Sequence, residues 1–338
     1  MQALICNSPG NLAYENIPAP ILKPGHAIIK IRRIGICGTD LHAYEGIQPF
    51  FTYPRILGHE LSADLIEADG AEGFVPGQIL TCIPYLNCGT CIACKNGKPN
   101  CCTELKVIGV HIDGGMSTYL SLPTSSLVKH AGLGYDELAL VEPLAIGAHG
   151  VSRANVQKDE FVLVIGAGPI GLATMEFARI AGARVIALDI NPFRLTFCKE
   201  NMNVDYCIDA RKEDTLARLK KITIGDMPTV VIDATGNLNA INNALQYVAH
   251  GGRLILIGLQ KEAFSFSHPE FHKRETTLMS SRNATRKDFE HVIKSIITGK
   301  IDPGKFITHR VKFNEIKDTF PSWLKPENNV IKAIVELD

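Results

Sequence analysis

The stretch FVLVIGAGPIG at residues 161–171 constrains the fold of this chain more than any other feature. It reads as a buried strand that runs into Gly166, Gly168 and Gly171 in the spacing G-x-G-x-x-G, and a helix-like segment follows. Glycines at this spacing permit a tight turn, close approach of a pyrophosphate to the backbone, and close packing of the helix on the strand. Because the helix N-terminus then faces the phosphates, the stretch predicts a dinucleotide site.

The residues after this turn strengthen the prediction. The next strand-like run, RVIALD, ends in Asp189, at about the distance that is typical of an acid that binds ribose hydroxyls. A carboxylate there repels a 2′-phosphate and favours NAD over NADP, although Arg194 could instead meet a 2′-phosphate or stack on the adenine. Strand-like runs at 229–236 and 252–259 alternate with helix-like segments, which predicts the α/β class with a doubly wound parallel sheet. The predicted cofactor-binding residues are Gly166, Gly168, Pro169, Ile170, Gly171, Asp189, Arg194, Ile257 and Gly258.

A second feature is the cysteine-rich segment CGTCIACKNGKPNCC. Cys88, Cys91 and Cys94 are separated by two residues each, and Cys102 follows, so that four thiolates can surround one tetrahedral zinc. Spacing alone leaves Cys101 open as the fourth ligand, although Cys102 is favoured. Four cysteines leave no open position for a substrate, which predicts a structural zinc. The alternative is a cysteine loop without metal, either redox-active or incidental.

Composition limits the partners and the compartment. The 35 Lys and Arg residues are balanced by 35 Asp and Glu residues, so no net charge favours phosphate backbones or anionic membranes. The N-terminus MQALICNSPG lacks a basic start before an apolar stretch, and no run reaches the ~18 apolar residues of a membrane span. We therefore expect a cytoplasmic protein with a small-molecule substrate and with neither nucleic acid nor membrane as a partner. Thiols stay reduced in that compartment, where clustered cysteines more often hold metal than form disulfides with each other.

The first part of the chain has a different pattern of residue types. Before residue 145, short β-branched runs are punctuated by Pro and Gly, which predicts a mostly β domain. Two stretches carry candidate metal ligands: GICGTDLH contains Cys37, and LGHE contains His59 and Glu60. A thiolate, an imidazole and a carboxylate can assemble a zinc site that retains an open position. Taken singly, each residue also reads as an ordinary core or surface residue.

In order along the chain, GICGTDLH, GHE, the four-cysteine segment, VEPLAIGAHG, GAGPIG and Asp189 resemble the zinc-dependent medium-chain dehydrogenases. This family includes alcohol, sorbitol and threonine dehydrogenases, and the resemblance covers essentially the whole chain. It implies a GroES-like catalytic domain at 1–145 with the zinc lobe at 88–102, a Rossmann NAD-binding domain at 146–288, and a C-terminal return to the catalytic domain at 289–338. VIKAIVEL reads as the returning strand. The resemblance also implies an active site in the cleft between the two domains and a homo-oligomer, either a dimer or a tetramer.

The resemblance assigns roles to individual residues. Cys37, His59 and Glu60 are catalytic zinc ligands, with Glu60 bound directly or exchanging with water. Glu142, in the EP dipeptide, either ligates this zinc or holds its water. Asp40 would accept a hydrogen bond from the second ring nitrogen of His59, or else act as a local turn cap.

Four further residues are candidates for the chemistry around the zinc. Thr39 and His42 resemble the family's hydroxyl-to-imidazole proton relay, although His42 also reads as a merely exposed histidine. His111 is a candidate for contact with a polyhydroxylated substrate and Arg282 for contact with the cofactor or a carboxylate, and both also read as ordinary surface or packing residues. The implied cofactors are two Zn²⁺ per chain, one catalytic and one structural, and NAD.

Within the family, the likeness is to the bacterial polyol and sugar-acid branch of the L-galactonate or L-gulonate 5-dehydrogenase type. It rests on YEGIQPFFTYPRILGHE, VIGVHIDGGMSTY and SSRNATRKDFEHVI. The implied reaction is the reversible oxidation of a secondary alcohol of a polyol or sugar acid to the ketone by hydride transfer to NAD, with zinc lowering the pKa of the alcohol. Two alternatives stay open: oxidation of an amino alcohol of the L-threonine type, and a catalytically silent NAD-binding sensor or scaffold. The sensor predicts NAD binding without turnover.

Overall fold

The computed structural model describes residues 1–49, 51–70, 72–130 and 132–337, so the final residue of the predicted C-terminal segment lies outside the described part. The chain divides into two compact units. The first contains Met1–Pro143 and Thr285–Asp338, and the second contains Leu144–Ala284.

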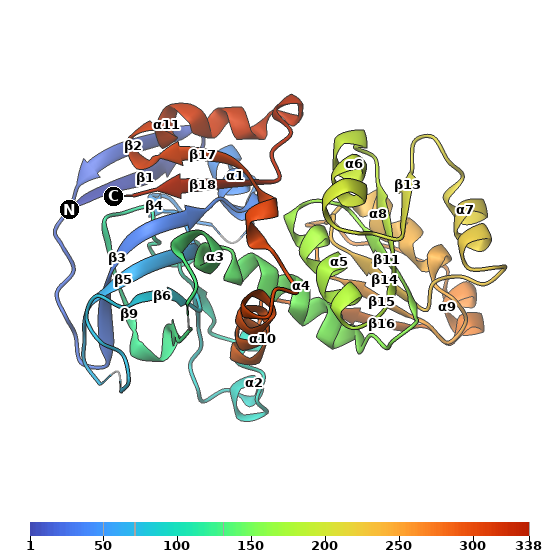
Figure 1. Cartoon of the computed structure of the whole chain (residues 1–338), viewed down its shortest axis with the longest axis horizontal. Helices are drawn as coiled ribbons and strands as arrows, with labels where there is room; N and C mark the ends of the chain where they lie inside the picture. Colours follow the sequence, from blue (N-terminus) through green and yellow to red (C-terminus); the bar gives the residue numbers. More distant parts are fainter. Residues whose placement is uncertain (50, 71, 131, 338) are drawn as a thin grey trace. The chain divides into compact units, whose positions relative to one another are not determined.

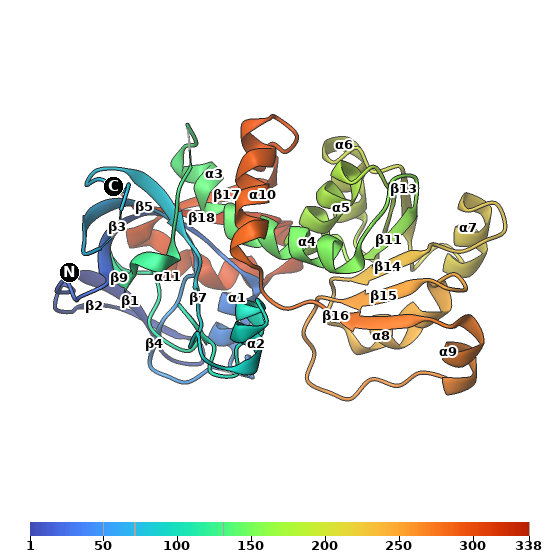
Figure 2. The same ribbon diagram turned by 90° about the horizontal axis from the view of Figure 1, so that it is seen from below.

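The second unit is a parallel sheet between helices. Its elements are α4 (Val141–Ala154, which begins in the first unit), β11 (Phe161–Ile165), α5 (Pro169–Ile180), β12 (Arg184–Asp189), α6 (Pro192–Asn201), β13 (Tyr206–Asp209), α7 (Thr215–Ile222), β14 (Val230–Asp233), α8 (Leu238–Ala244), β15 (Arg253–Leu256), α9 (His268–Arg274) and β16 (Thr277–Ser280). All pairings are parallel, in the order β13-β12-β11-β14-β15-β16 (Figure 1). α5 and α6 cover one face and α8 covers the other (Figure 2). The predicted doubly wound sheet is confirmed.

The strands of this sheet are short apolar runs because both faces are covered. Leu163, Ile186 and Val231, on three neighbouring strands, have no exposed surface and share one core. Strands buried on both faces lose the alternation of apolar and polar residues that marks a half-exposed strand. The sequence could therefore place these strands by their β-branched content and by the glycines that end them.

The first unit is mostly β. Its elements are β1 (Gln2–Ser8), β2 (Asn11–Asn16), β3 (His26–Gly35), α1 (Gly38–Glu45), β4 (Arg55–Ile56), β5 (Glu60–Ala68), β6 (Ile79–Cys82), β7 (Tyr85–Leu86), α2 (Ile92–Lys95), β8 (Lys106–Val107), β9 (Tyr119–Pro123), β10 (Leu127–Val128), α3 (Tyr135–Ala139), α10 (Arg286–Ile297), β17 (Ile307–Lys312), α11 (Ile316–Thr319) and β18 (Lys332–Glu336). The largest sheet has the order β10-β6-β5-β3-β18-β17, with β9 also paired to β3, and β2-β1-β4 form a smaller one (Figure 1).

The C-terminal strand β18 inserts into the larger sheet beside β3. Val335 pairs with Ile34 and Ile334 pairs with Gly35, in antiparallel register. Leu4, Ile34 and Val335 are fully buried in the core of this unit. The register brings the start of β18 beside the end of β3, which is where the candidate metal ligands lie.

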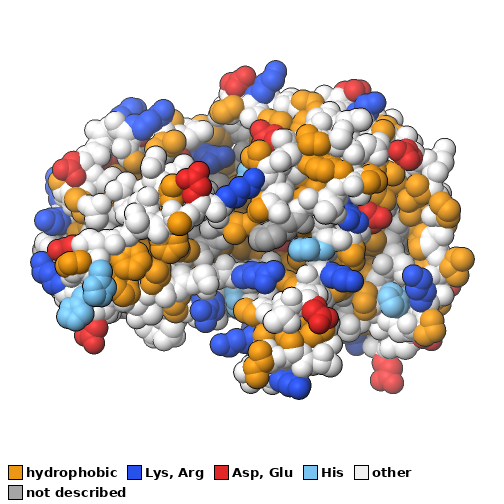
Figure 3. Space-filling view, turned by 180° about the vertical axis from the view of Figure 1, so that it is seen from behind, with side chains coloured by type: hydrophobic (Ala, Val, Ile, Leu, Met, Phe, Trp, Pro, Cys, Tyr) orange, Lys and Arg blue, Asp and Glu red, His pale blue; other side chains and the backbone are white. Residues whose placement is uncertain are grey.

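The described residues include no helix that combines the length and the apolar composition needed to cross a bilayer. On the face shown in Figure 3, basic and acidic side chains are both scattered among apolar and neutral polar groups. This surface agrees with the balanced charge of the chain.

Candidate catalytic and structural metal centres

Cys37, His59 and Glu60 form the first cluster. One candidate ligand atom from each lies within 4.8 Å of the other two. Cys37 is the residue before α1, His59 ends the loop that leads into β5, and Glu60 is the first residue of β5. His59 and Glu60 are buried, and Cys37 is half-buried. A thiolate, an imidazole and a carboxylate fit zinc, and three protein ligands leave a fourth position open.

Glu60 pairs with a buried lysine. The Nζ atom of Lys332 lies 2.7 Å from each carboxylate oxygen of Glu60 and 3.0 Å from the carbonyl oxygen of Ile36. A Cβ atom at Gly35 would lie 2.0 Å from Glu60 Oε2, so glycine is required where β3 passes Glu60. Burial opposes the charge of Lys332, but Glu60 and Cys37 outweigh it and raise the lysine pKa. The cluster therefore contains a fixed positive charge on the side of Glu60.

Asp40 lies beside His59 but does not form the predicted hydrogen bond. The distance from His59 Nδ1 to Asp40 Oδ1 is 3.7 Å, and this buried nitrogen has no hydrogen-bond partner. The Asp40 carboxylate instead accepts the backbone N–H groups of Cys37 (2.9 Å) and Gly58 (3.2 Å). Asp40 thus caps α1 and ties it to the loop before His59. Burial opposes the protonation of His59, but the charges of Asp40 and Cys37 raise its pKa well above the usual value.

Glu142, in the first turn of α4, lies near this cluster but is not a member of it. Among the described residues, the cluster whose ligand atoms all lie within 4.8 Å of one another contains only Cys37, His59 and Glu60. The Glu142 carboxylate accepts a hydrogen bond from the hydroxyl of Tyr85, and both side chains are buried. Burial raises the pKa of Glu142 to about 7, although His59 opposes this effect.

Neither Lys332 nor Tyr85 was predicted from the sequence to belong to the site. For Lys332 a signal existed, because a lysine inside the apolar run VIKAIVEL must find a partner if that run is buried. For Tyr85 no comparable signal exists, since an aromatic residue in CIPYLNC reads as an ordinary core residue. Its partner Glu142 is distant in the sequence, and only the fold brings the two together.

The remaining candidate residues, Thr39, His42, His111 and Arg282, lie at separate places in the fold. Thr39 and His42 both lie on α1, three residues apart and hence on one helix face, with Thr39 half-buried and His42 exposed. His111 accepts the backbone N–H of Val107 at its Nδ1 atom and so closes a local turn. Arg282 belongs to the second unit, where its side chain is exposed.

Cys88, Cys91, Cys94 and Cys102 form the second cluster, with their sulfurs within 4.8 Å of one another. The favoured fourth member, Cys102, is buried, and its neighbour Cys101 is exposed. Backbone N–H groups point at the sulfurs: those of Cys88 and Glu104 donate to Cys102, and that of Cys91 donates to Cys88. Such donors stabilise thiolates, and backbone N–H groups of Cys94 and Thr103 lower the pKa of Cys91 to about 5.

The donor chemistry of this second cluster fits zinc. Four sulfurs around one Zn²⁺ at about 2.3 Å would be about 3.8 Å apart. The four sulfurs here all lie within 4.8 Å of one another. All four protein ligands come from one short segment, and none of the positions is left for a substrate. The segment therefore forms a structural zinc site.

The glycine turn of the second unit has the geometry of a phosphate site. Gly166 has φ of 95°, and a Cβ atom on Gly171 would lie 1.8 Å from the carbonyl oxygen of Gly166, so both positions require glycine. A Cβ atom on Gly168 would meet nothing closer than Arg194 Nη1, at 3.7 Å. The backbone at Gly168 is thus open to a ligand, and Pro169 and Ile170 begin α5 immediately after it.

The other predicted cofactor residues lie at the same edge of this sheet. Asp189 ends β12, and its carboxylate accepts the N–H groups of Ala167 (2.6 Å) and Asn191 (2.7 Å). Ile257 and Gly258 follow β15 and donate their N–H groups to the carbonyl of Asp233. Carboxyl ends of parallel strands are where nucleotides bind in such sheets. Asp189 therefore also holds the glycine turn in place. From the sequence it was predicted only to bind the ribose hydroxyls.

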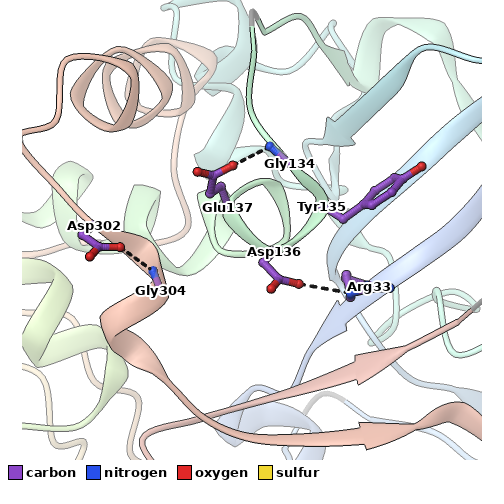
Figure 4. Close-up of a pocket in the computed structure, with 7 residues that line it drawn as sticks. All are labelled: Arg33, Gly134, Tyr135, Asp136, Glu137, Asp302 and Gly304. Atoms are coloured by element: carbon purple, nitrogen blue, oxygen red, sulfur yellow. Dashed lines mark hydrogen bonds and ion pairs between the residues drawn. The ribbon is translucent and has the colours of Figure 1, made fainter.

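A separate pocket of about 430 Å³ lies in the first unit, between α3, the end of β3 and residues 302–304 (Figure 4). Its charged groups are already paired. Asp136 contacts Arg33, Glu137 accepts the N–H of Gly134, and Asp302 accepts the N–H of Gly304. None of the predicted site residues lines it.

Comparisons with known proteins agree with this geometry. Residues 23–132 match the family model described as alcohol dehydrogenase GroES-like domain, and residues 169–298 match the model described as zinc-binding dehydrogenase. L-galactonate-5-dehydrogenase of Escherichia coli K12 is 42% identical over 336 residues, which cover 99% of this chain and 98% of the relative. The starvation-sensing protein RspB of the same organism is 31% identical, with 99% of each chain covered.

A solved structure shows the same architecture. The crystal structure of the alcohol dehydrogenase rspB from Escherichia coli CFT073, complexed with NADH, superimposes with a TM-score of 0.93 at 29% sequence identity. The match covers 100% of this chain and 99% of that one.

Proposed function

The chain belongs to the family of zinc-dependent medium-chain dehydrogenases, and from this premise we propose that it oxidises a secondary hydroxyl of a sugar acid of the L-galactonate type, or of a related polyol, to the ketone with NAD. The protein is a zinc-dependent alcohol or polyol dehydrogenase that uses a nicotinamide cofactor. The buried cluster of Cys37, His59 and Glu60, with three ligands and an open position, carries the proposal. The 42% identity to L-galactonate-5-dehydrogenase supports the substrate class.

Cys37, His59 and Glu60 hold the catalytic zinc. When bound, zinc supplies the Lewis acidity that lowers the pKa of a substrate hydroxyl, and the nicotinamide supplies the hydride acceptor. The protein contributes a buried cluster of charged side chains, in which Lys332 pairs with Glu60 and Asp40 ties α1 to the loop that carries His59. Glu142 offers a carboxylate beside the open position, where it can accept a hydrogen bond from the reacting hydroxyl.

The proton lost by the substrate needs a path to solvent. Thr39 and His42 lie on one face of α1, with Thr39 half-buried and His42 exposed, so the pair spans from the buried side of the helix to water. We assign them the relay: the Thr39 hydroxyl passes the proton outward and the His42 imidazole releases it. This assignment rests on their placement and on the family resemblance.

NAD is favoured over NADP by Asp189. Its carboxylate is fixed at the end of β12 by two backbone N–H groups, and each oxygen retains a lone pair for a ribose hydroxyl. A 2′-phosphate at this position would meet a negative charge that cannot move away.

The test is NADH formation, followed by absorbance, with L-galactonate, L-gulonate, sorbitol, L-threonine and a simple alcohol, together with zinc analysis of the same sample. The proposal expects turnover with a sugar acid or polyol at about two zincs per chain. Preferred turnover of L-threonine would move the protein to the amino-alcohol branch, to which a 28% identical relative, L-threonine 3-dehydrogenase of Rhizobium etli, belongs by name. Faster turnover with NADP than with NAD would contradict the role of Asp189.

A further inference from the structure

Tyr85 is a buried tyrosine whose hydroxyl has one acceptor, the carboxylate of Glu142. Tyr85 is 7% exposed and Glu142 is 4% exposed, so water competes little for this hydrogen bond. We propose that Tyr85 is a positioning residue: it holds the Glu142 carboxylate beside the Cys37, His59 and Glu60 cluster and keeps it from becoming a fourth ligand, so that the open position stays available to the substrate hydroxyl. The proposal rests on the dehydrogenase function proposed above and extends it.

Without restraint, the Glu142 carboxylate would approach a metal ion held by the cluster. A carboxylate next to a divalent cation in a buried site is strongly attracted to it, because the low dielectric leaves their interaction almost unscreened. A dehydrogenase of this kind needs the opposite, since a site whose four positions are all filled by protein has no room for a substrate. Something must therefore restrain Glu142, and in this structure its described side-chain hydrogen-bond donor is Tyr85.

The other carboxylate of the site, Glu60, has a hydrogen-bond donor of its own. Lys332 contacts both oxygens of Glu60 at 2.7 Å and is therefore occupied. A neutral hydroxyl is the donor left for Glu142, and it adds no charge that would repel the metal. The two carboxylates are thus restrained in different ways: Glu60, a member of the cluster, by an ion pair, and Glu142, outside the cluster, by a hydrogen bond.

Tyr85 is itself held in place by its neighbours in the fold. Its ring packs edge-on against Phe289 of α10, with ring centroids 6.3 Å apart and planes at 81°. Tyr85 lies on β7, where it pairs with Val107 of β8, and the N–H of Ile108 donates to the carbonyl of Pro84 at 3.0 Å. β7 leads into the cysteine segment and β8 follows it (Figure 2 shows β7 and the helix α2 of that segment). The structural zinc site therefore closes the loop whose base carries Tyr85.

A purely structural role for Tyr85 makes a different prediction. Core packing needs the ring, which phenylalanine keeps, whereas restraint of Glu142 needs the hydroxyl. Tyr85→Phe removes only that hydroxyl. Tyr14→Phe is the matched control, because the Tyr14 hydroxyl donates to a backbone carbonyl, that of Phe313, and its ring also packs edge-on against a phenylalanine, at 5.6 Å and 71°. The side-chain hydrogen bond and the ring contact described for Tyr14 are both with Phe313, which is not a proposed ligand.

The experiment compares wild type, Tyr85→Phe and Tyr14→Phe after zinc is replaced by cobalt(II), whose visible absorption reports the number and type of its ligands. We expect Tyr85→Phe, and not Tyr14→Phe, to change the cobalt spectrum in the absence of substrate, because the released carboxylate fills the open position. In the zinc enzymes we expect kcat of Tyr85→Phe to fall by about 10–100-fold, while KM for NAD changes less than about twofold.

A Tyr85→Phe protein with the cobalt spectrum and the kcat of the wild type would overturn the proposal. Equal spectral changes in both variants would also overturn it, because they would arise from loss of a tyrosine hydroxyl in general. The spectra are recorded without substrate, so they do not depend on the substrate class. A wild type that oxidises no sugar acid or polyol, together with a spectral change confined to Tyr85→Phe, would refute the proposed substrate and retain the role of Tyr85.

Discussion

The two metal clusters of the first unit are built in opposite ways. The four-cysteine cluster takes identical ligands from one short segment, is largely half-exposed, and receives backbone N–H groups at its sulfurs. The cluster of Cys37, His59 and Glu60 combines three ligand types from the start of a helix and the start of a strand, is largely buried, and is surrounded by charged or hydroxyl side chains.

This difference shows how a protein separates stability from reactivity. A closed shell of thiolates satisfies the metal and needs only local chain geometry, so its surroundings can be simple. An open shell must be kept incomplete, and this requires restraint of every nearby group that could complete it. In this chain Tyr85 restrains Glu142, and Lys332 fixes Glu60, a member of the cluster. The side-chain donors described at the sulfurs of the four-cysteine segment are the exposed Asn87 and Thr90, each 3.6 Å from a sulfur.

The largest expected effect comes from Cys37→Ala. Loss of the thiolate removes a ligand from the open cluster and leaves the four-cysteine cluster intact. We expect kcat to fall at least about a thousandfold, because the Lewis acid is lost, while the fluorescence titration of NADH gives an unchanged affinity. Activity equal to that of the wild type would show that the chemistry does not depend on this cluster.

Lys332→Met tests the restraint around the open cluster. The substitution leaves Glu60 as a buried charge without its partner, which costs about 3–5 kcal/mol in the free energy of unfolding. The control is Arg310→Met on the neighbouring strand β17, whose ion pairs with Asp136 and Glu336 are far more exposed and contribute about 1 kcal/mol or less. Urea denaturation measures both. Equal losses in the free energy of unfolding would mean that the buried ion pair of Lys332 with Glu60 contributes no more than an exposed ion pair.

Cys94→Ser tests the closed cluster, with Cys101→Ser as its control. Cys94 belongs to the cluster, whereas Cys101 lies seven positions on, is exposed and is not a member. We expect Cys94→Ser to lower the free energy of unfolding by about 3 kcal/mol and Cys101→Ser to leave it unchanged. The kcat of folded Cys94→Ser should fall far less than that of Cys37→Ala, since β8 and Phe289 still hold Tyr85. A stable Cys94→Ser protein without turnover would show that the catalytic and structural roles of the two clusters are the reverse of those assigned here.

The smallest expected effect is that of Asn87→Ala. Asn87 is exposed and donates to the Cys94 sulfur at 3.6 Å, which is a weak hydrogen bond in contact with water. Its removal should change the free energy of unfolding by less than about 0.5 kcal/mol, in contrast to Lys332→Met. A larger loss in urea denaturation would show that the closed cluster also depends on its surrounding side chains.

The same contrast explains what the sequence could predict. The four-cysteine cluster was predictable because its ligands are close in sequence, and so was the glycine turn after β11. The three ligands of the open cluster were predicted as single candidates from GICGTDLH and LGHE, and the family resemblance joined them into one set. Lys332 lies more than 270 positions from Glu60 and meets it because β18 and β5 both pair with β3. A register of this kind is a property of the sheet and leaves no local trace in the sequence.

The prediction of a hydrogen bond between Asp40 and His59 was wrong for a related reason. The sequence placed the two residues near one zinc, but it could not show that the Asp40 carboxylate is already engaged by two backbone N–H groups. These bonds hold the carboxylate 3.7 Å from His59 Nδ1. Competition among local donors is decided by loop geometry, which motif spacing does not describe.

The measurement that tests this account most directly is the zinc content of purified Cys37→Ala beside that of the wild type. The account predicts about two zincs per chain in the wild type and about one in the variant, with the variant folded and without turnover. A folded Cys37→Ala protein that retains about two zincs per chain would contradict the central claim that Cys37, His59 and Glu60 hold a catalytic zinc separate from the structural one.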